Sequence, residues 1–385
     1  MIIKSLLDTD LYKFTMGQVV FHKFPDAMVE YTFKCRNEDV DLTPYTSEII
    51  AEIDNLCNLR FQDDEIKYLR KLGWFKPSYL EFLKLLKLDS KCVQITSYHG
   101  QFGLNIVGPW LSTIYFEVPV LAIINEVYFR NKAVPGVGQE RLTEKIELIN
   151  HKADDNFKFS DFGTRRRYSF EWQHYIIGEL FRKTLPYRFT GTSNVYLAKK
   201  YGISPIGTMA HEFIQACQAF VRIRDSQKFA FQTWADEYRG DLGIALSDTL
   251  GMDAFLNDFD KYFAKLFDGA RHDSGDPFVW CDKLIEHYKK LKIDPMTKTA
   301  VFSDGLTFPK AIELAERYKG KINTAFGIGT NLMNDFSFCP LNIVIKMAQC
   351  NGCSVAKISD TLSKQMCKDE DYLNYLKKVF NIEDK

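Results

Sequence analysis

A histidine and an aspartate at neighbouring strand ends are the clearest candidates for covalent chemistry. His211 follows the small-residue run Gly207-Thr208-Met209-Ala210 at the start of a predicted helix, and Asp248 lies at the end of the next predicted strand. An aspartate that holds one imidazole nitrogen leaves the other nitrogen free to act as a nucleophile or a base. Adjacent strands lie roughly 4.8 Å apart, so the two side chains can meet. A lone histidine is usually structural, and the paired Asp248 is what favours a catalytic role for His211.

The segment from Arg271 to Asp276 gathers two carboxylates, a guanidinium, a hydroxyl and a glycine behind another predicted strand. Arginine suits anionic oxygens, and carboxylates suit ribose hydroxyls or Mg²⁺. The same composition also fits a surface turn, but the position at a strand end favours a site. The candidates from this segment are Arg271, Asp273, Ser274 and Gly275.

Three further segments join a strand end to a helix start: Gly191-Thr192-Ser193-Asn194, Ser303-Asp304-Gly305 and Gly327-Ile328-Gly329-Thr330. Glycine lets the backbone approach a ligand, and free N–H groups with the helix dipole attract phosphate. Any one of these segments also fits an ordinary tight turn. Together they predict a phosphate cradle, because (β/α) barrels build their active sites from the loops after the strands.

Two other patterns suggest different chemistry. The run Arg165-Arg166-Arg167 is compatible with nucleic-acid binding, but without a wider basic excess it fits one anion contact with solvated neighbours better. Cys350 and Cys353 flank Asn351-Gly352, the dipeptide of a tight hairpin turn, which explains their spacing without a metal. A zinc site that also used Cys339 and Cys367 is the alternative, and we assign no role to these four cysteines.

The elements that must position these groups fall into two patterns. The first 150 residues mix helices and strands without alternation: a helix over 11–23 with Asp10 as its cap, a strand over 29–36, helices over 47–59, 64–72 and 78–88, strands over 92–98 and 103–107, and a long apolar helix over 111–130. After residue 150, seven short strands alternate with amphipathic helices: 157–161, 187–190, 205–208, 243–247, 267–271, 299–303 and 324–327. That alternation predicts parallel βαβ units.

The predicted fold class is therefore α/β, with a (β/α) barrel as the first choice and an open doubly wound sheet as the second. A hairpin around Asn351-Gly352 and a helix over 371–380 close the chain. The predicted division is an N-terminal α+β domain (1–150), an α/β barrel domain with the active site (151–335), and a C-terminal hairpin and helix (336–385) packing on the N-terminal domain.

Composition narrows the class of protein. The chain has 385 residues, of which 46% are hydrophobic, and its 50 basic and 50 acidic side chains cancel. Bulk charge therefore recruits neither nucleic acid nor an anionic membrane. The start of the sequence shows no secretory signal and no run reaches the roughly 20 apolar residues of a membrane span. Nine scattered cysteines fit reduced thiols, so we expect a soluble cytoplasmic protein.

At this point a family resemblance becomes clear, and it covers almost the whole chain. The chain resembles the nicotinate phosphoribosyltransferases in residues 8–13 (DTDLYK), 161–167 (DFGTRRR), 191–194 (GTSN), 207–212 (GTMAHE), 271–276 (RHDSGD) and 326–330 (FGIGT), and in the C-terminal run 340–346. The resemblance implies an irregular seven-stranded barrel beside a mixed N-terminal domain. It also implies condensation of nicotinate with phosphoribosyl pyrophosphate to nicotinate mononucleotide and pyrophosphate, driven by ATP through a transient phosphohistidine at His211.

The resemblance also implies roles for individual residues. Phe162, beside Gly163, stacks on the pyridine ring, and Tyr12 closes the ring from the other side, from a second subunit of a homodimer. Arg165 and Arg271 contact anionic groups, and Asp273 contacts the ribose or the metal. The 5′-phosphate cradle comprises Gly305, Gly327 and Gly329, with Ser303, Asp304, Thr330 and Thr192 in the same motifs. Mg²⁺ is expected to bind through the pyrophosphate, with no protein ligand assigned beyond a candidate role for Asp273.

Substrate choice points to Ser193. The related nicotinamide enzyme carries an aspartate at this position, where it accepts from the amide. A serine hydroxyl donates instead to the carboxylate of nicotinate. Three rival readings remain: a nicotinamide-specific transferase, another barrel enzyme that acts on a sugar phosphate, and a nucleic-acid or zinc-binding module.

Overall fold

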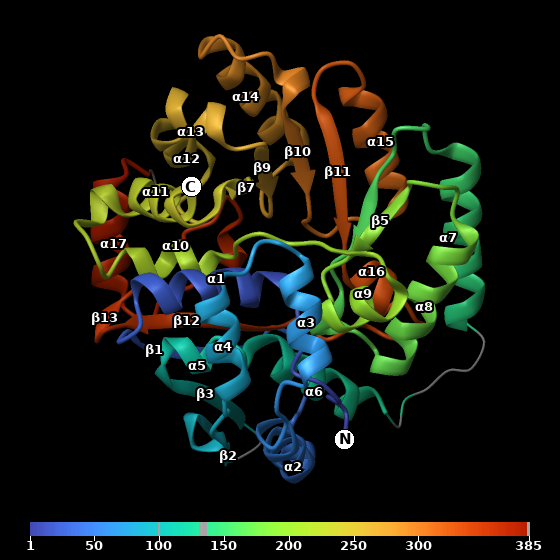
Figure 1. The fold of residues 1–385 in the computed structure, drawn as a ribbon, viewed down its shortest axis with the longest axis vertical. Helices are drawn as coiled ribbons and strands as arrows, with labels where there is room; N and C mark the ends of the chain where they lie inside the picture. The colour runs from blue at the N-terminus through green and yellow to red at the C-terminus, as the bar shows by residue number, and fades with distance from the viewer. Residues whose placement is uncertain (99–100, 131, 133–136, 383–385) are drawn as a thin grey trace.

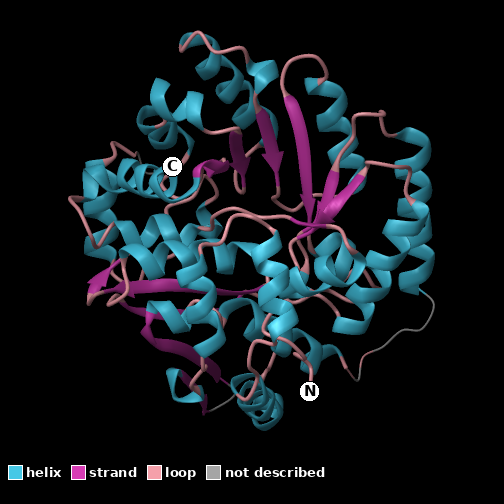
Figure 2. Cartoon of the chain, viewed as in Figure 1, coloured by secondary structure: helices cyan, strands magenta, loops and turns pink. Residues whose placement is uncertain are grey.

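Two β-sheets of different construction organise the chain in the computed structural model, which describes residues 1–98, 101–130, 132 and 137–382. One sheet is five-stranded and antiparallel in the order β13-β12-β1-β3-β2. The other has seven strands in the order β6-β5-β4-β11-β10-β9-β8. In Figure 1 the antiparallel strands lie below and the seven-stranded sheet above, and the magenta arrows of Figure 2 mark both.

The N-terminal region forms nearly as its sequence predicts. Helix α1 (Leu11–Lys23) has the expected bounds, but the Asp10 side chain makes no cap hydrogen bond and instead accepts one from Ser193. Strand β1 (Met28–Cys35) buries alternate residues, as its period of two requires. The three predicted helices and two strands follow: α2 (Thr46–Cys57), α3 (Asp63–Lys71), α4 (Pro77–Leu85), β2 (Val93–Tyr98) and β3 (Gln101–Pro109).

The prediction of a single helix over 111–130 is wrong in one respect. The structure divides this segment into α5 (Trp110–Thr113) and α6 (Glu117–Phe129). Pro119 lies in the first turn of α6. Proline has no N–H to donate to the carbonyl four residues before it, so a continuous helix through this point would lose a bond and meet the ring. Proline is tolerated in the first turn, where the new helix begins.

All seven strands predicted after residue 150 are present, and each pairs in parallel with its neighbours. They are β4 (Phe159–Asp161), β5 (Phe189–Thr192), β6 (Ser204–Pro205), β8 (Ile244–Leu246), β9 (Gly269–His272), β10 (Thr299–Phe302) and β11 (Asn323–Ile328), and a further strand, β7 (Arg239–Leu242), precedes β8. Among the described residues no ladder joins the end strands β6 and β8. Thr208 Oγ1, just after β6, donates to the Ile244 carbonyl at 2.9 Å. The fold is thus mixed α/β with a curled parallel sheet.

Apart from α7, which precedes β4, the helices of this half follow the strands as βαβ units require. They are α7 (Val137–Lys152), α8 (Phe170–Lys183), α9 (Val195–Tyr201), α10 (His211–Cys217), α11 (Ser226–Tyr238), α12 (Met252–Asp258), α13 (Lys261–Leu266), α14 (Pro277–Lys290), α15 (Phe308–Tyr318) and α16 (Thr330–Met333). Asn194 and Asp276 cap α9 and α14 with their side chains. Capping fixes where these helices begin, and hence where the preceding loops end.

The C-terminal segment returns to the antiparallel sheet. Strand β12 (Ile343–Cys350) pairs with β1, and a two-residue turn connects it to β13 (Cys353–Ser354). Asn351 and Gly352 both have positive φ (50° and 75°), as a type I′ turn requires. Helix α17 (Glu370–Val379) follows. Residues 1–150 and 336–385 therefore share one sheet, although the domain bounds stay a prediction and residues 383–385 lie outside the described chain.

Candidate active site

A cavity of about 850 Å³ opens between the carboxyl ends of the parallel strands and strand β12. Thirteen of the residues singled out from the sequence line it: Tyr12, Phe162, Gly163, Arg165, Ser193, His211, Arg271, Asp273, Ser303, Asp304, Gly305, Gly329 and Thr330. The parallel topology explains this gathering, because it places all the strand ends on one edge of the sheet. The loops after β4, β5, β9, β10 and β11 all contribute.

The other five predicted residues are not part of the cavity lining but contact residues around it. Thr192 Oγ1 donates to the buried Asp161 at 2.6 Å, and Ser274 Oγ donates to Asp248 at 2.7 Å. The backbone N–H of Gly275 donates to a threonine hydroxyl in the C-terminal segment. A Cβ at Gly327 would overlap the Phe162 ring, so this glycine makes room for the aromatic side chain. The fifth is Asp248, which supports His211.

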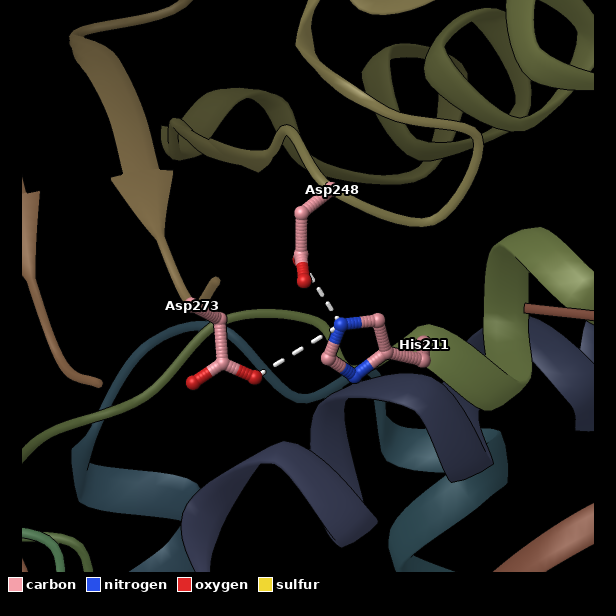
Figure 3. Close-up of side chains that lie close together, drawn as sticks. All are labelled: His211, Asp248 and Asp273. Atoms are coloured by element: carbon pink, nitrogen blue, oxygen red, sulfur yellow. Dashed lines mark hydrogen bonds and ion pairs between the residues drawn. The ribbon is translucent and has the colours of Figure 1, made fainter. Parts of the chain in front are cut away.

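His211 lies at the first turn of α10 with its ring between two carboxylates (Figure 3). Nε2 is 2.8 Å from Asp248 Oδ1 and 3.5 Å from Asp273 Oδ2. Burial, and then the nearby Lys357 ammonium, lower the pKa of His211 to about 4. The imidazole is therefore neutral at neutral pH. With the Nε2 proton donated to Asp248, Nδ1 keeps its lone pair and its nucleophilicity.

The two aspartates are held as anions. Burial alone would raise the pKa of Asp248, but Lys357 and His211 bring it well below its usual range. The Lys357 ammonium lies 2.8 Å from Asp248 Oδ2. Burial and Asp248 would likewise raise the pKa of Asp273, but His211 and Lys357 lower it to about 2. Asp273, which lines the cavity, thus presents a negative charge to whatever binds there.

Sequence reasoning missed a set of cations from the C-terminal segment. Lys346 on β12, Lys357 and Lys364 all line the cavity. Lys364 donates to the Asp273 backbone carbonyl at 2.8 Å and pairs with Asp304. Burial lowers the pKa of Lys346 to about 7, because Glu117 only partly offsets burial and the neighbouring cations. One signal was available: Lys346 interrupts the apolar run of β12.

Arg36, at the end of β1, adds another cation to the same wall, near Arg165 and Arg166. Arg167 differs from the sequence prediction of a solvated neighbour. Its guanidinium is fully buried and makes two hydrogen bonds, of 2.6 and 2.8 Å, to Asp8. A buried ion pair of this geometry is structural, so only the first two arginines of the run face the cavity.

Two aromatic side chains, Phe162 and Tyr12, border the cavity from opposite parts of the sequence. Phe162 follows β4, and Tyr12 lies in the first turn of α1. Both come from the same chain, whereas the family resemblance implied that Tyr12 would come from a second subunit. One chain therefore suffices to supply both residues to one cavity.

A buried ion-pair network borders the cavity through Glu117 and Glu212. Lys13 is completely buried, and its ammonium contacts both Glu117 and Glu212. Trp110 and Tyr31 donate to the other oxygen of Glu212 at 3.3 Å. The network ties α1, α6 and α10 together, so it fixes the start of the helix that carries His211.

No group of cysteines among the described residues lies close enough together to share a metal ion. The nine cysteines are free, with Cys350 buried and Cys353 exposed across the hairpin turn. In the part of the chain that the structure describes, the group of His, Cys, Asp and Glu side chains close enough to share a metal ion is His211, Asp248 and Asp273. Within the same residues, none of the helices has the length and apolar character to cross a membrane.

Comparison with known proteins shows which family this chain resembles. The family model described as the nicotinate phosphoribosyltransferase (NAPRTase) family matches residues 157–384, and the model of its N-terminal domain matches residues 7–125. The chain is 56% identical over 394 residues to a nicotinate phosphoribosyltransferase of Acidovorax sp. (strain JS42), covering 99% of each protein. It is 55% identical to one of Ralstonia nicotianae, covering 100% of each.

Solved structures agree. The crystal structure of nicotinate phosphoribosyltransferase from Vibrio cholerae is similar with a TM-score of 0.95 and 41% identity, covering 100% of this chain and 95% of that one. The enzyme from Porphyromonas gingivalis is similar with a TM-score of 0.93 and 34% identity, covering 99% and 100%. Similarity of this extent, in sequence and in structure, means that the chain belongs to the nicotinate phosphoribosyltransferase family.

Proposed function

We propose that the protein transfers the phosphoribosyl group of phosphoribosyl pyrophosphate to nicotinate, with ATP hydrolysis driving the reaction. The observation that carries this proposal is a single cavity with three kinds of wall: an aromatic pair, a cation-rich face and a neutral, carboxylate-held histidine. The products are nicotinate mononucleotide and pyrophosphate, together with ADP and phosphate.

The aromatic pair and the cation-rich face suit the transfer step. Phe162 and Tyr12 offer two faces for a flat pyridine ring, and Arg165 and Arg271 lie within the same cavity for anionic groups. Departure of pyrophosphate leaves positive charge on the ribose carbon. Asp273, ionised because of its low pKa, is placed to stabilise that charge or to hold a ribose hydroxyl. The lysines of the C-terminal segment face the leaving pyrophosphate.

His211 suits the ATP step. Its Nδ1 lone pair attacks the γ-phosphorus of ATP, an N–P bond forms, and the bond to the β-phosphate oxygen breaks with its electrons on ADP. Asp248 holds the Nε2 proton and stabilises the positive charge that develops on the ring. Water later cleaves the N–P bond and returns phosphate. Lys357 keeps Asp248 ionised throughout.

Mg²⁺ fits this site through its substrates. The ion prefers oxygen ligands and commonly binds one or two carboxylates together with phosphate oxygens. Asp273 is the carboxylate in the cavity that fits this role, since Asp304 is already paired with Lys364. Bound Mg²⁺ would neutralise charge on the pyrophosphate.

We also propose a cytoplasmic location and a homodimer. The free cysteines favour a reducing cytoplasm. We keep the homodimer as a prediction, but its original reason, Tyr12 acting across an interface, is removed because Tyr12 borders the cavity of its own chain.

The test is transfer of phosphate from γ-labelled ATP to wild-type protein, to His211→Ala and to His174→Ala, with nicotinate mononucleotide measured in parallel. His174 lies on α8 outside the cavity lining and serves as the matched control. We expect acid-labile label on the wild type and the control, none on His211→Ala, and faster product formation with ATP. Product formation without label would contradict the phosphohistidine. The absence of both label and product would contradict the proposed function.

A further inference from the structure

Asp10 and Ser193 form a hydrogen-bonded pair in the wall of the cavity. Ser193 Oγ donates to Asp10 Oδ1 at 2.7 Å, and the Leu11 N–H donates to the Ser193 carbonyl at 2.8 Å. Both side chains are more than nine-tenths buried and both line the cavity. The serine hydroxyl has one hydrogen, and in this state Asp10 accepts it. A nicotinate carboxylate arriving at Ser193 would therefore meet an oxygen without a free donor.

The charge of Asp10 is poorly compensated. No ion pair to Asp10 exists among the residues that the structure describes, since Arg165 lies close enough only for a longer-range attraction. Burial raises the pKa of Asp10, and the Ser193 and Thr164 hydroxyls oppose that rise. The titratable groups facing Asp10 from the surrounding elements are Tyr12 on α1, Glu117 on α6, Asp161 on β4, and Arg165 and Arg167 around η3 (Thr164–Arg166).

We propose that Asp10 takes up a proton when nicotinate binds and so reverses the hydrogen bond to Ser193. The protonated Asp10 then donates to Ser193 Oγ, and Ser193 donates to the substrate carboxylate. A second carboxylate brought into this wall disfavours two adjacent negative charges, which supplies the driving force for proton uptake. The proposal rests on the proposed function and deepens it, making Asp10 a positioning residue for substrate choice.

The two candidate substrates should then behave differently. Neutral nicotinamide adds no charge, so Asp10 stays ionised, and the Ser193 oxygen can accept from the amide N–H. Nicotinate binds with a proton, and its advantage over nicotinamide should shrink as pH rises and protons become scarce. Specificity at this wall is then set by the protonation of Asp10 as well as by the identity of residue 193.

Titration calorimetry of the full-length wild-type protein with nicotinate tests this directly. Binding enthalpies measured at about pH 8 in buffers of different ionisation enthalpy report the protons exchanged on binding. We expect uptake of about one proton with nicotinate and none with nicotinamide. Nicotinate binding without proton uptake would overturn the inference and leave the proposed function standing. Absence of nicotinate binding would overturn both.

The Asp10→Asn variant assigns the proton. Its amide can donate permanently to Ser193 Oγ, so nicotinate should bind without proton uptake, and the pH dependence of the nicotinate-to-nicotinamide ratio of kcat/KM should disappear. Lys346 is the other cavity group whose pKa, about 7, would let it take up a proton beside an anion. Proton uptake that persists in Asp10→Asn would assign it to such a group and overturn the role of Asp10.

Discussion

The protonation states of His211 and Asp248 are set jointly by burial and by neighbouring charges. His211, Asp248 and Lys357 form a chain in which each charge sets the protonation of the next. Lys357 keeps Asp248 anionic, and Asp248 holds one nitrogen of a histidine that burial keeps neutral. A neutral, oriented imidazole is what a phosphoryl acceptor requires.

The lowered pKa of His211 should appear in the pH dependence of stability. The folded protein binds the proton of His211 only below about pH 4, whereas an unfolded chain binds it below about 6.5. The unfolded state thus holds more protons across this window, so the free energy of unfolding falls as pH falls from 6.5 to 4, by up to about 3 kcal/mol. Urea unfolding at pH values across the window measures it.

His211→Gln is the matched variant for this measurement, because it keeps a polar side chain that does not titrate. We expect the stability of the variant to fall less steeply with decreasing pH than that of the wild type. Equal slopes in the two proteins would mean that His211 titrates normally in the folded state.

Site residues were predictable from the sequence where the order of strands brings them together, and not where the contact joins segments far apart in the chain. His211 and Asp248 were found because both follow strands of the same parallel sheet. The expected reason, pairing of adjacent strands, is wrong, because β6 and β8 are the two end strands of the sheet and its curl brings their ends together. Lys357 was missed because it reaches Asp248 from a segment more than a hundred residues away, and no periodicity reports such a contact. The Asp10–Ser193 pair was missed for the same reason.

At the scale of elements, the C-terminal hairpin is the part that completes the cavity. Strand β12 pairs with β1 in a register that places Lys346 opposite Thr32, and Lys357 follows directly after β13. The turn at Asn351-Gly352 holds this register because both residues accept positive φ. The hairpin therefore sets the positions of two cations that the proposed reaction uses.

Gly352→Ala tests this role. An alanine at φ 75° strains the turn by about 1 kcal/mol, and slippage of the hairpin would displace Lys346 and Lys357. We expect the KM for phosphoribosyl pyrophosphate to rise several-fold. Gly320→Ala is the control, because Gly320 has φ 71° and equally open surroundings but lies between α15 and β11. An equal effect of the two substitutions on KM would mean that general destabilisation is the cause.

Elements were predictable where local sequence decides them. The seven parallel strands and the Asn351-Gly352 turn follow from short-range patterns, and all are present. The break between α5 and α6 was missed because the apolar run continues through it, and only Pro119 marked the interruption. Whether the curled sheet closes could not be predicted, because closure depends on contacts between strands distant in sequence.

At the scale of the whole molecule, both sheets of one chain contribute to one cavity. Phe162 comes from the parallel half, Lys346 from the antiparallel sheet, and Tyr12 from the first helix. The buried hydrophobic core likewise runs through both halves without interruption. The two halves are thus joined both by packing and by the cavity between them.

Mixing two inactive variants measures whether the site belongs to one chain. Tyr12→Ala and Phe162→Ala, unfolded and refolded together, should recover no activity if each site takes both residues from the same chain. In a homodimer with a shared site, about a quarter of the sites in the mixture would be intact, because half the dimers are mixed. Recovery to that level would mean that Tyr12 and Phe162 of one site come from two subunits.

The return of β12 to β1 also has a consequence in time. During synthesis the chain grows from its N-terminus at roughly 5–20 residues per second. Strand β1 therefore cannot pair with β12 until nearly all of the protein has been synthesised. Until then the edge of β1 that will pair with β12 stays open, and the cavity lacks Lys346, Lys357 and Lys364. The cavity wall that these three lysines form is therefore complete only when the last segment of the chain has been made.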